Sequence, residues 1–391
     1  MRVLIITWGG GGASQPALGL GRRLVERGHD VRVVGPRSFG ERVSAAACRL
    51  RAYPAELELD PSSQLMFEEQ SEYAVELFFG QRLPALVDAE LDLESADVVV
   101  VDYLLRTVAC RLEARPMPVV LLTHMAYRHA APAVDEREDE WSQRWQYRLV
   151  NQAREEMGLR SLPVGPEALC IALGRRADRV IVTIPRELDP WPEIPAHVVH
   201  VGPIPEETAA DSWNSPWAAN DPTPLVVISM STMYMRHETV LGRAASAAAA
   251  CGARVLVLTG FELDPDSVTF PSGVIVRSYV PHSHVLPQAS LVVTHAGIGT
   301  LIAAFAAGVP TICLPLGRDQ HVNAARAQKL GASITLAADS DQPTLEQAIH
   351  AALTSPNLVE AAQLLASRLA AYGDGRRAVE IVEQLGMRAT V

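Results

Sequence analysis

Short apolar runs alternate along the chain with polar turns and longer amphipathic stretches. Residues 1–7 (MRVLIIT) form the first such run, and a glycine-rich turn at residues 9–12 leads into an amphipathic stretch. The same order restarts at residues 225–230 (LVVISM), where the turn holds Ser231 and Thr232. Apolar runs of this length are typical of strands that are buried on both faces of a parallel sheet. Two such beginnings predict an α/β protein with two Rossmann-like domains.

The boundary between the two domains is marked by a change in composition. Residues 206–222 (EETAADSWNSPWAANDP) lack the periodicity of a helix or strand and are rich in residues that favour loops. We therefore expect a first domain over residues 1–205 and a linker over residues 206–222. A second domain is expected over residues 223–358, followed by closing helices over residues 359–391.

Length and composition narrow the class of protein. The chain has 391 residues, enough for two domains of about 200 residues each. Its hydrophobic share of 48% and its charged share of 20% are ordinary for a globular α/β protein. The net charge of -11 argues against nucleic acid as a partner, because nucleic acid requires a basic surface.

The chain carries no pattern typical of a membrane or secreted protein. Its five cysteines are scattered and odd in number, which indicates reduced, buried side chains rather than disulfides or a metal framework. No apolar run approaches the ~18 residues of a membrane span, and the first run is only as long as a strand. We therefore expect a cytoplasmic protein without a membrane partner.

Candidate chemistry is concentrated after residues 291–294 (LVVT), an apolar run that predicts a buried strand. His295, Gly297, Gly299 and Thr300 follow directly, where a helix is expected to begin. The backbone N–H groups and the positive dipole of a helix N-terminus favour an anion, and the glycines let its oxygens approach closely. This segment therefore predicts a phosphate site.

Two further polar side chains are expected at the same edge of the second sheet. Residues 311–316 (TICLPL) predict the next strand, and Asp319 and Gln320 follow it. The carboxyl ends of neighbouring parallel strands meet at one edge of a sheet, which is where α/β proteins bind ligands. A phosphate site beside groups that bind hydroxyls suits a nucleotide sugar.

With these residues in view, residues 279–326 closely resemble the donor-binding signature of the inverting GT-B glycosyltransferases, in the bacterial antibiotic branch of macrolide and enediyne type. In that family the motif at His295 holds the diphosphate, the residue before Val-Pro stacks on the base, and Asp-Gln binds sugar hydroxyls. The donor-side residues that the resemblance implies here are Thr232, Tyr279, Val280, His295, Gly297, Gly299, Thr300, Asp319 and Gln320.

The resemblance also implies an architecture and a set of partners. The fold would be GT-B, in which two Rossmann-like parallel-sheet domains face a central cleft and the closing helices pack back on the N-terminal domain. The partners would be a nucleotide sugar and a small-molecule acceptor, with no cofactor and no metal. The sequence contains no Asp-x-Asp metal motif. The oligomeric state is left open, a dimer included.

One departure from the family pattern concerns the donor. Family members that use UDP-sugars often carry a glutamate eight residues after the motif histidine, where it holds both ribose hydroxyls. This chain has Ala303 there. A deoxyribose has no such pair of hydroxyls, so a dTDP-sugar loses little from the change, and we predict dTDP over UDP. The alternative is that another residue holds the ribose.

A second departure concerns the general base. The family's first turn reads Gly-His-x-x-Pro, and its histidine deprotonates the acceptor hydroxyl, oriented by an aspartate. Here the turn reads Gly12-Ala13-Ser14-Gln15-Pro16, so Ala13 occupies the position of the base. The aspartate is retained as Asp102, after the apolar run 98–101. The acceptor-side loop is thus Gly12, Ala13 and Ser14, and its family base is missing.

Three interpretations follow from the missing base, which in general contributes about 10²–10⁴-fold to rate. The acceptor is acidic enough to need none, as a thiol, phenol or acyl oxygen is. Alternatively, Asp102 or His124, which follows the apolar run 118–122, takes the role. Or the protein has lost turnover and retains binding. Simpler roles also remain open, with Asp102 as a helix N-cap and His124 as a hydrogen-bonded pocket residue.

The sequence therefore predicts an inverting glycosyltransferase that moves a deoxysugar from a dTDP donor to a small natural-product acceptor. Its catalytic candidates are Asp102 and His124. The first alternative is a catalytically degenerate GT-B protein that binds nucleotide sugars or assists another enzyme. The second is a nucleotide-sugar 2-epimerase, which would need more acid–base carboxylates near the sugar than Asp319. The acceptor, the sugar and the type of glycosidic bond stay open.

Overall fold

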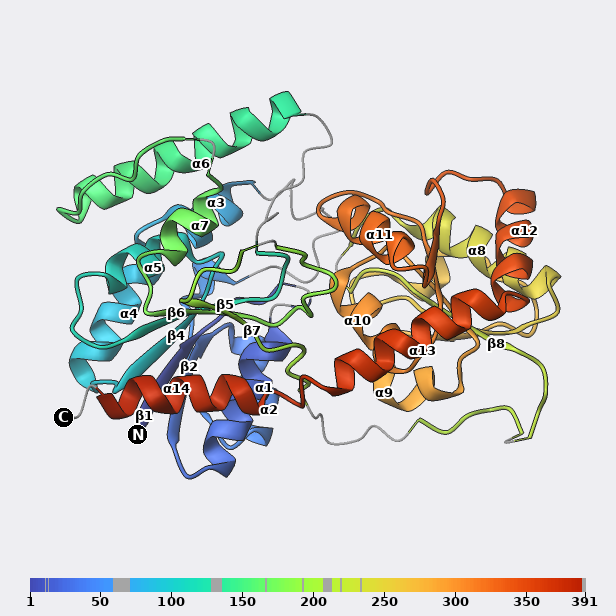
Figure 1. Cartoon of the computed structure of the whole chain (residues 1–391), viewed down its shortest axis with the longest axis horizontal. Coiled ribbons are helices and arrows are strands. Elements are labelled where there is room, and N and C mark those ends of the chain that lie inside the picture. Colours follow the sequence, from blue (N-terminus) through green and yellow to red (C-terminus); the bar gives the residue numbers. More distant parts are fainter. Residues whose placement is uncertain are drawn as a thin grey trace. The chain divides into compact units, whose positions relative to one another are not determined.

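Two all-parallel β-sheets, each covered by helices, form the core of the molecule (Figure 1). The computed structural model describes residues 1–10, 12, 14–58, 71–127, 136–165, 167–191, 193–206, 213–218, 220–232 and 234–388. These residues fall into two compact units. The first holds the described residues up to Glu206 and from Tyr372 onward, and the second holds those from Trp213 to Ala371. The prediction of two parallel-sheet α/β domains is confirmed.

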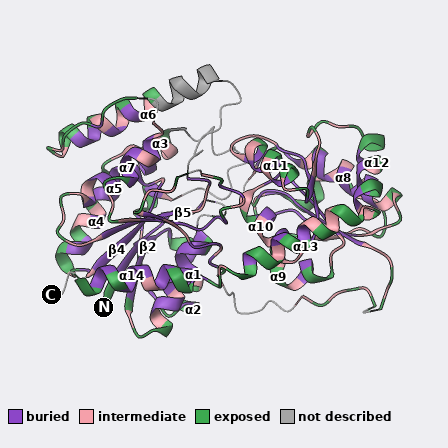
Figure 2. Ribbon diagram, viewed as in Figure 1, coloured by how far each residue is buried: buried purple, intermediate pink, exposed green. Residues whose placement is uncertain are grey.

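The first unit contains a seven-stranded sheet with the strand order β3-β2-β1-β4-β5-β6-β7. Its strands are β1 (Arg2–Ile6), β2 (Asp30–Gly35), β3 (Arg49–Ala52), β4 (Val98–Asp102), β5 (Val119–Thr123), β6 (Arg179–Val182) and β7 (Val198–His200). The central strand β4 and its neighbour β5 are buried along their whole length, as Figure 2 shows. Burial on both faces explains why their sequences read as continuous apolar runs.

Helices cover both faces of this first sheet (Figure 1). The helices of this unit are α1 (Ser14–Glu26), α2 (Gly40–Ala45), α3 (Ser71–Phe79), α4 (Arg82–Leu93), α5 (Arg106–Leu112), α6 (Glu136–Glu156), α7 (Leu169–Gly174) and α14 (Arg376–Arg388), with short 3₁₀ turns at Arg37–Phe39 and Ala55–Leu57. Helix α6 packs on α5 and α7 rather than on the sheet. One apolar cluster joins α1, α14 and the inner strands through Leu20, Val3 and Val382, all of which are fully buried.

The second unit contains a six-stranded sheet with the order β10-β9-β8-β11-β12-β13. Its strands are β8 (Leu225–Ser229), β9 (Arg254–Leu258), β10 (Ile275–Arg277), β11 (Leu291–Thr294), β12 (Thr311–Cys313) and β13 (Ser333–Thr335). Its helices are α8 (Glu238–Ala250), α9 (His282–Val285), α10 (Ile298–Ala306), α11 (Gln320–Lys329), α12 (Gln342–Leu353) and α13 (Pro356–Ala370), with 3₁₀ turns at Pro265–Ser267 and Leu286–Gln288.

Each sheet has one point at which the strand order reverses. In the first sheet β1 lies between β2 and β4, and in the second sheet β8 lies between β9 and β11. The loops that follow the two strands at such a point diverge to opposite faces and leave space for a ligand at the carboxyl edge. These two positions are where the sequence places the acceptor-side loop and the phosphate motif.

The C-terminal helices divide between the two units. We expected the chain to leave the second domain at residue 359. In the structure α13 packs against α10, with Gly308 facing Gln363, and the chain passes to the first unit at Tyr372. Helix α14 then packs against α1 and β4, and its Glu383 accepts hydrogen bonds from Arg27 and lies 2.8 Å from His29.

No helix among the described residues is both long enough and apolar enough to cross a membrane.

Gly202 lies against Tyr372, the residue at which the chain returns to the first unit. Gly202 has φ of +72°, and a Cβ there would lie 2.5 Å from both Cβ and Cγ of Tyr372. Replacing Gly202 with alanine should therefore lower the free energy of unfolding through backbone strain of about 1–2 kcal/mol plus an overlap of similar size. Thermal unfolding should show a larger loss than for Gly28→Ala, where φ is +84° but the space is open. Equal losses in the two variants would show that the contact with Tyr372 is unimportant.

Candidate functional site

The phosphate motif of the second unit lies at its switch point, directly after β11. His295 is 7% exposed, and its Nδ1 lies 3.4 Å from the hydroxyl of Thr294. Gly297 is the N-cap of α10, and a Cβ there would lie 2.5 Å from Cε1 and Nε2 of the His295 ring. Only glycine therefore allows the histidine ring to lie against the start of the helix.

The other residues of the motif face outward to different degrees. Gly299 is exposed and Thr300 is 9% exposed, both in the first turn of α10. The free N–H groups of that turn and the helix dipole favour an anion. The structure thus brings together, at one helix start, the histidine, the two glycines and the threonine that the sequence singled out.

Burial sets the charge of His295. Burial, with smaller contributions from the nearby His237 and Arg318, lowers the pKa of the imidazole to about 3. A neutral imidazole at physiological pH acts as a hydrogen-bond donor to an anion rather than as a fixed positive charge. His237 is itself fully buried at the N-cap of α8, and neither ring nitrogen has a hydrogen bond of good geometry to the described residues.

Backbone strain gathers around the same motif. Among the described residues other than glycine, four have a left-handed backbone, and three of these flank the candidate site: Arg236, Ala296 and Arg318, with φ of 50°, 66° and 54°. Each costs about 1 kcal/mol or more relative to a relaxed conformation, and such residues concentrate at ligand sites. The loops after β8, β11 and β12 are therefore held in defined, unfavourable conformations.

The Asp-Gln pair after β12 is only partly available to a ligand. Gln320 is 2% exposed, and its Oε1 accepts hydrogen bonds from the backbone N–H groups of Leu316 at 2.7 Å and Gly317 at 3.1 Å. Its side chain shapes the loop from within. Asp319 is partly exposed at the N-cap of α11, and its Oδ2 accepts a hydrogen bond from Asn323 at 2.8 Å.

Asn323 connects the two loops of the site, a role that the sequence did not reveal. Its side-chain nitrogen donates to Asp319 and also to the carbonyl of Ala296 at 3.2 Å, and the residue is 1% exposed. The only signal in the sequence is its spacing, four residues after Asp319, which places both on one face of a helix. Asn323 thus fixes the aspartate relative to the phosphate motif.

An aromatic pair lies at the carboxyl edge of β9 and β10. Tyr279 is 37% exposed, and its ring stacks on Phe261 with centroids 5.2 Å apart and an interplanar angle of 26°. Phe261 is 69% exposed, which is unusual for a large apolar side chain. The sequence indicated Tyr279 but not Phe261. Val280, next to Tyr279, is 5% exposed and packs in an apolar cluster with Val285.

The loop after β8 completes this edge. Ser231 is 7% exposed, and Thr232 is exposed directly beside it. A Cβ at Gly260 would lie 2.6 Å from the carbonyl oxygen of Ser231, so the loops after β8 and β9 are in close contact. Thr232 therefore lies on the loop that faces the start of α10 across the switch point.

In the first unit, Asp102 and His124 come together at the carboxyl edge of β4 and β5. Nδ1 of His124 lies 3.2 Å from Oδ2 of Asp102, and the side chains are 12% and 2% exposed. The two atoms are close but lack the alignment of a full hydrogen bond. Catalytic hydrogen bonds are often loose before substrate binds and tighten in the complex. The ring of Tyr103 packs edge-on against His124, with centroids 5.6 Å apart.

Asp102 is not the N-cap of the following helix. That position belongs to Leu105, whereas Oδ1 of Asp102 accepts a hydrogen bond from the backbone N–H of Leu104 at 2.9 Å. One carboxylate oxygen thus holds the turn and the other faces His124. The simpler role that the sequence left open for Asp102 is replaced by a turn contact.

The acceptor-side loop is described only in part. Ala13 lies outside the described residues. Gly12 is exposed and has open space where a Cβ would be. Ser14 is 3% exposed, and its hydroxyl accepts a hydrogen bond from Arg42 at 3.0 Å, while Arg42 also binds Glu206. The hydroxyl of Ser14, the first residue of α1, is therefore already bonded to Arg42 of α2.

No cluster of three or more histidine, cysteine, aspartate or glutamate side chains that suits a metal ion occurs among the described residues.

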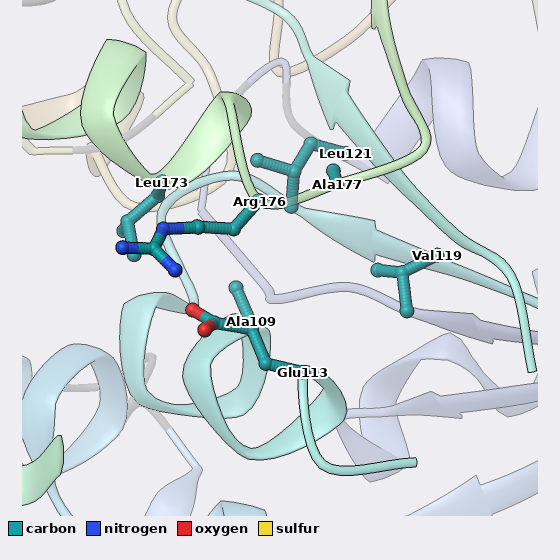
Figure 3. A pocket seen from close by; sticks show the side chains of 7 residues that line it. All are labelled: Ala109, Glu113, Val119, Leu121, Leu173, Arg176 and Ala177. Carbon is teal, nitrogen blue, oxygen red and sulfur yellow. The ribbon is translucent and has the colours of Figure 1, made fainter. Parts of the chain in front are cut away.

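A small hollow between α5 and α7 is lined by seven residues, among them Val119 and Glu113 (Figure 3). Val119 begins β5, and Glu113 is paired with Arg154, so this hollow lies toward the amino ends of the strands. It is not connected with the candidate site.

Known proteins are similar to this chain in both sequence and fold. Residues 243–385 match the family described as "Erythromycin biosynthesis protein CIII-like, C-terminal domain". The chain is 28% identical over 344 residues to demethyllactenocin mycarosyltransferase of Streptomyces fradiae, covering 82% of this chain and 72% of that protein. It is 26% identical over 390 residues to oleandomycin glycosyltransferase of Streptomyces antibioticus, covering 95% and 88%.

Solved structures agree with this relationship at the level of fold. The glycotransferase of kitacinnamycin superimposes with a TM-score of 0.81 at 21% identity and covers 98% of both chains. The glycosyltransferase VinC in complex with dTDP superimposes with a TM-score of 0.72 at 17% identity and covers 99% of this chain and 100% of that one. The chain therefore has the GT-B fold and is similar in sequence to glycosyltransferases of antibiotic pathways. It is a glycosyltransferase, as the sequence predicts.

The buried His295 should make stability depend on pH. Its pKa is about 3 in the folded protein against an ordinary 6.5, so the unfolded chain binds the additional proton between these values. Stability should therefore fall as pH decreases from about 6.5 toward 3, by up to ~1.4 kcal/mol per pH unit for this group. In urea unfolding, His295→Gln should lose less stability than wild type as pH decreases from about 6.5 toward 3. His350→Gln, an exposed control on α12, should lose as much as wild type. Identical slopes for wild type and His295→Gln would contradict the assignment.

Proposed function

We propose that the protein is an inverting glycosyltransferase that moves a deoxysugar from a dTDP-sugar to a hydroxyl of a small natural-product acceptor, with His124 as general base and Asp102 as its orienting carboxylate. The observation that carries this proposal is the 3.2 Å approach of His124 Nδ1 to Asp102 Oδ2. In the resembled family the aspartate orients a histidine on the first turn, where this chain has Ala13. Here Asp102 faces a histidine that the neighbouring strand supplies.

The chemistry of a base fits His124 better than Asp102. A carboxylate at Nδ1 fixes the tautomer that leaves Nε2 free to accept a proton, and it stabilises the imidazolium that forms. Nε2 of His124 has no hydrogen bond to any residue that the structure describes, so it is the nitrogen available to an acceptor hydroxyl. One oxygen of Asp102 accepts a hydrogen bond from Leu104, and the other lies 3.2 Å from Nδ1 of His124.

The donor half of the proposal rests on the second unit. The start of α10, with His295, Gly299 and Thr300, suits a diphosphate, and Thr232 adds a hydroxyl from the loop after β8. Tyr279 offers a face on which the nucleobase stacks, next to Val280, and Asp319 keeps one carboxylate oxygen for sugar hydroxyls. Gln320 takes part indirectly, because its amide holds the loop that carries Asp319.

The reaction would be a single displacement. The acceptor oxygen attacks the anomeric carbon while its proton passes to Nε2 of His124, and the bond from that carbon to the diphosphate oxygen breaks. The configuration at the anomeric carbon inverts. Negative charge then grows on the leaving diphosphate, where backbone N–H groups and the helix dipole are already oriented to receive it. These groups provide the stabilisation without a metal.

The choice of dTDP rests on Ala303, which lies on α10 and packs against an apolar cluster. It offers no group to hold a pair of ribose hydroxyls. Two relatives support the proposal: one is named a mycarosyltransferase, and one with the same fold was solved with dTDP.

A second function remains worth testing. Because Ala13 removes the family's own base, a GT-B protein that binds nucleotide sugars without turnover would retain the same donor site. The two functions differ in one respect: only an active transferase needs the Asp102–His124 contact.

Replacing His124 with alanine should lower kcat by about 10²–10⁴-fold, because the proton acceptor is lost. Asp102→Asn should also lower kcat, since it removes the charge that stabilises the imidazolium. The control is His200→Gln, which disrupts another buried histidine–aspartate pair of the first unit, with His200 Nε2 3.0 Å from Asp189 Oδ2. It should lower stability and leave kcat nearly unchanged. An unaltered kcat in His124→Ala would remove His124 from the mechanism.

Replacing Ala303 with glutamate should increase the affinity for UDP relative to dTDP. The new carboxylate would accept hydrogen bonds from two ribose hydroxyls, and a pair of charge-assisted hydrogen bonds contributes roughly 10-fold or more. Isothermal titration of both nucleotides into wild type and Ala303→Glu measures the change, with Ala303→Gln as the uncharged control. If wild type already binds UDP as tightly as dTDP, the donor assignment is wrong.

A further inference from the structure

A buried arginine of the first unit has no acidic partner among the residues that the structure describes. Arg106 is the first residue of α5 and is 8% exposed. Within the described residues, its guanidinium makes one long hydrogen bond to the carbonyl of Leu104, at 3.4 Å, and lies over the ring of Phe79, 5.0 Å from its centroid. Nε has no hydrogen-bond partner, and no carboxylate of the described residues forms an ion pair with the side chain.

None of the described groups around Arg106 forms an ion pair with it. Those that act on it electrostatically are Tyr103, Cys170 and Asp102. Burial raises the pKa of the Cys170 thiol to about 12, so this group is neutral at physiological pH. Asp102 is engaged by Leu104 and His124. Burial accordingly lowers the pKa of the Arg106 guanidinium.

The other buried arginines of the described chain show what is missing. Arg32 binds Glu90 at 2.8 Å, Arg154 is paired with Glu113, and Arg23 lies 3.9 Å from Asp374. Each has a carboxylate as well as backbone carbonyls. Arg106 alone among these buried arginines has no acidic partner, and it also sits in the first turn of a helix, where the dipole disfavours a positive charge.

A buried and uncompensated cation carries a large free-energy cost, which an anion at the same place removes. We propose that Arg106 binds a carboxylate group of the acceptor, so that the acceptor is a small acid. A planar guanidinium with free N–H groups matches a carboxylate in a bidentate pair, better than it matches a hydroxyl or a carbonyl. The inference rests on the proposed function, because it names the substrate class of that site.

The position of Arg106 suits this role. It follows Asp102 by four residues on the same strand-to-helix connection, at the carboxyl edge from which His124 also projects. Beside it, Phe79 packs edge-on against Trp145 with centroids 5.6 Å apart, and both rings provide apolar surface for the body of an acceptor. The carboxylate at one end of the acceptor would be held by Arg106. A hydroxyl elsewhere on the acceptor would then face His124. Arg106 is therefore a residue that determines specificity rather than one that takes part in proton transfer.

Thermal unfolding with matched pairs of probes tests the proposal. The probes are salicylate and salicylamide, 4-hydroxybenzoate and 4-hydroxybenzamide, and 3-hydroxy-2-naphthoate and its amide, all at constant ionic strength. At least one carboxylate should raise Tm in a saturable way while its amide does not. Arg106→Met should weaken the binding of that carboxylate by about tenfold or more. Arg111→Met, the control on the same helix, removes an arginine that is paired with Asp88 and should retain the effect.

The unliganded Arg106→Met variant gives an independent outcome. Removal of an uncompensated buried charge should leave Tm unchanged or raise it. A clear loss of Tm, together with equal responses to carboxylates and amides in wild type, would show that Arg106 is only structural and would overturn the proposal. Stabilisation by dTDP should be the same in wild type and Arg106→Met. If dTDP fails to stabilise wild type, the proposed function itself fails; if dTDP stabilises and no carboxylate does, only this inference fails.

Discussion

The parallel direction of every strand is the constraint on which the rest of this molecule depends. Because each crossover returns the chain to the same end of the sheet, the carboxyl ends of all strands in a unit share one edge. Polar side chains that are far apart in the sequence therefore meet there, as Asp102 and His124 do after β4 and β5. The reversal of strand order then opens that edge between β1 and β4 and between β8 and β11.

The same constraint explains how a missing base can be replaced nearby. Adjacent parallel strands end about 5 Å apart, so a histidine after β5 lies within reach of an aspartate after β4. His124 contacts Asp102 at the ends of β4 and β5. Arg106, which has no acidic partner among the described residues, begins the helix that follows β4. In the second unit the corresponding edge carries strained backbone at Ala296 and Arg318, and Asn323 holds the two loops together.

Much of the fold was predictable because its signals are local. The strands β1, β8 and β11 are continuous apolar runs, and the glycines of the candidate phosphate motif follow β11 directly, so sequence order alone placed these residues at the carboxyl end of β11. The contributions of Asn323, His237 and Phe261 were not predictable, because each depends on contacts with residues distant in the chain. Gln320 was indicated as a sugar ligand, but its amide bonds to the loop, which only the three-dimensional structure reveals. The course of α13 was also missed, since an amphipathic helix does not record which unit it packs against.

The most direct test of the account is the thermal unfolding of the wild-type protein with dTDP, UDP and GDP, each over a concentration series. A nucleotide that binds the folded state should add about 2.7 kcal/mol to stability at 100 times its dissociation constant. The account predicts that dTDP stabilises the protein strongly and at lower concentration than UDP or GDP. Unfolding that no nucleotide alters would contradict it, because the motif at His295 would then not be a donor site.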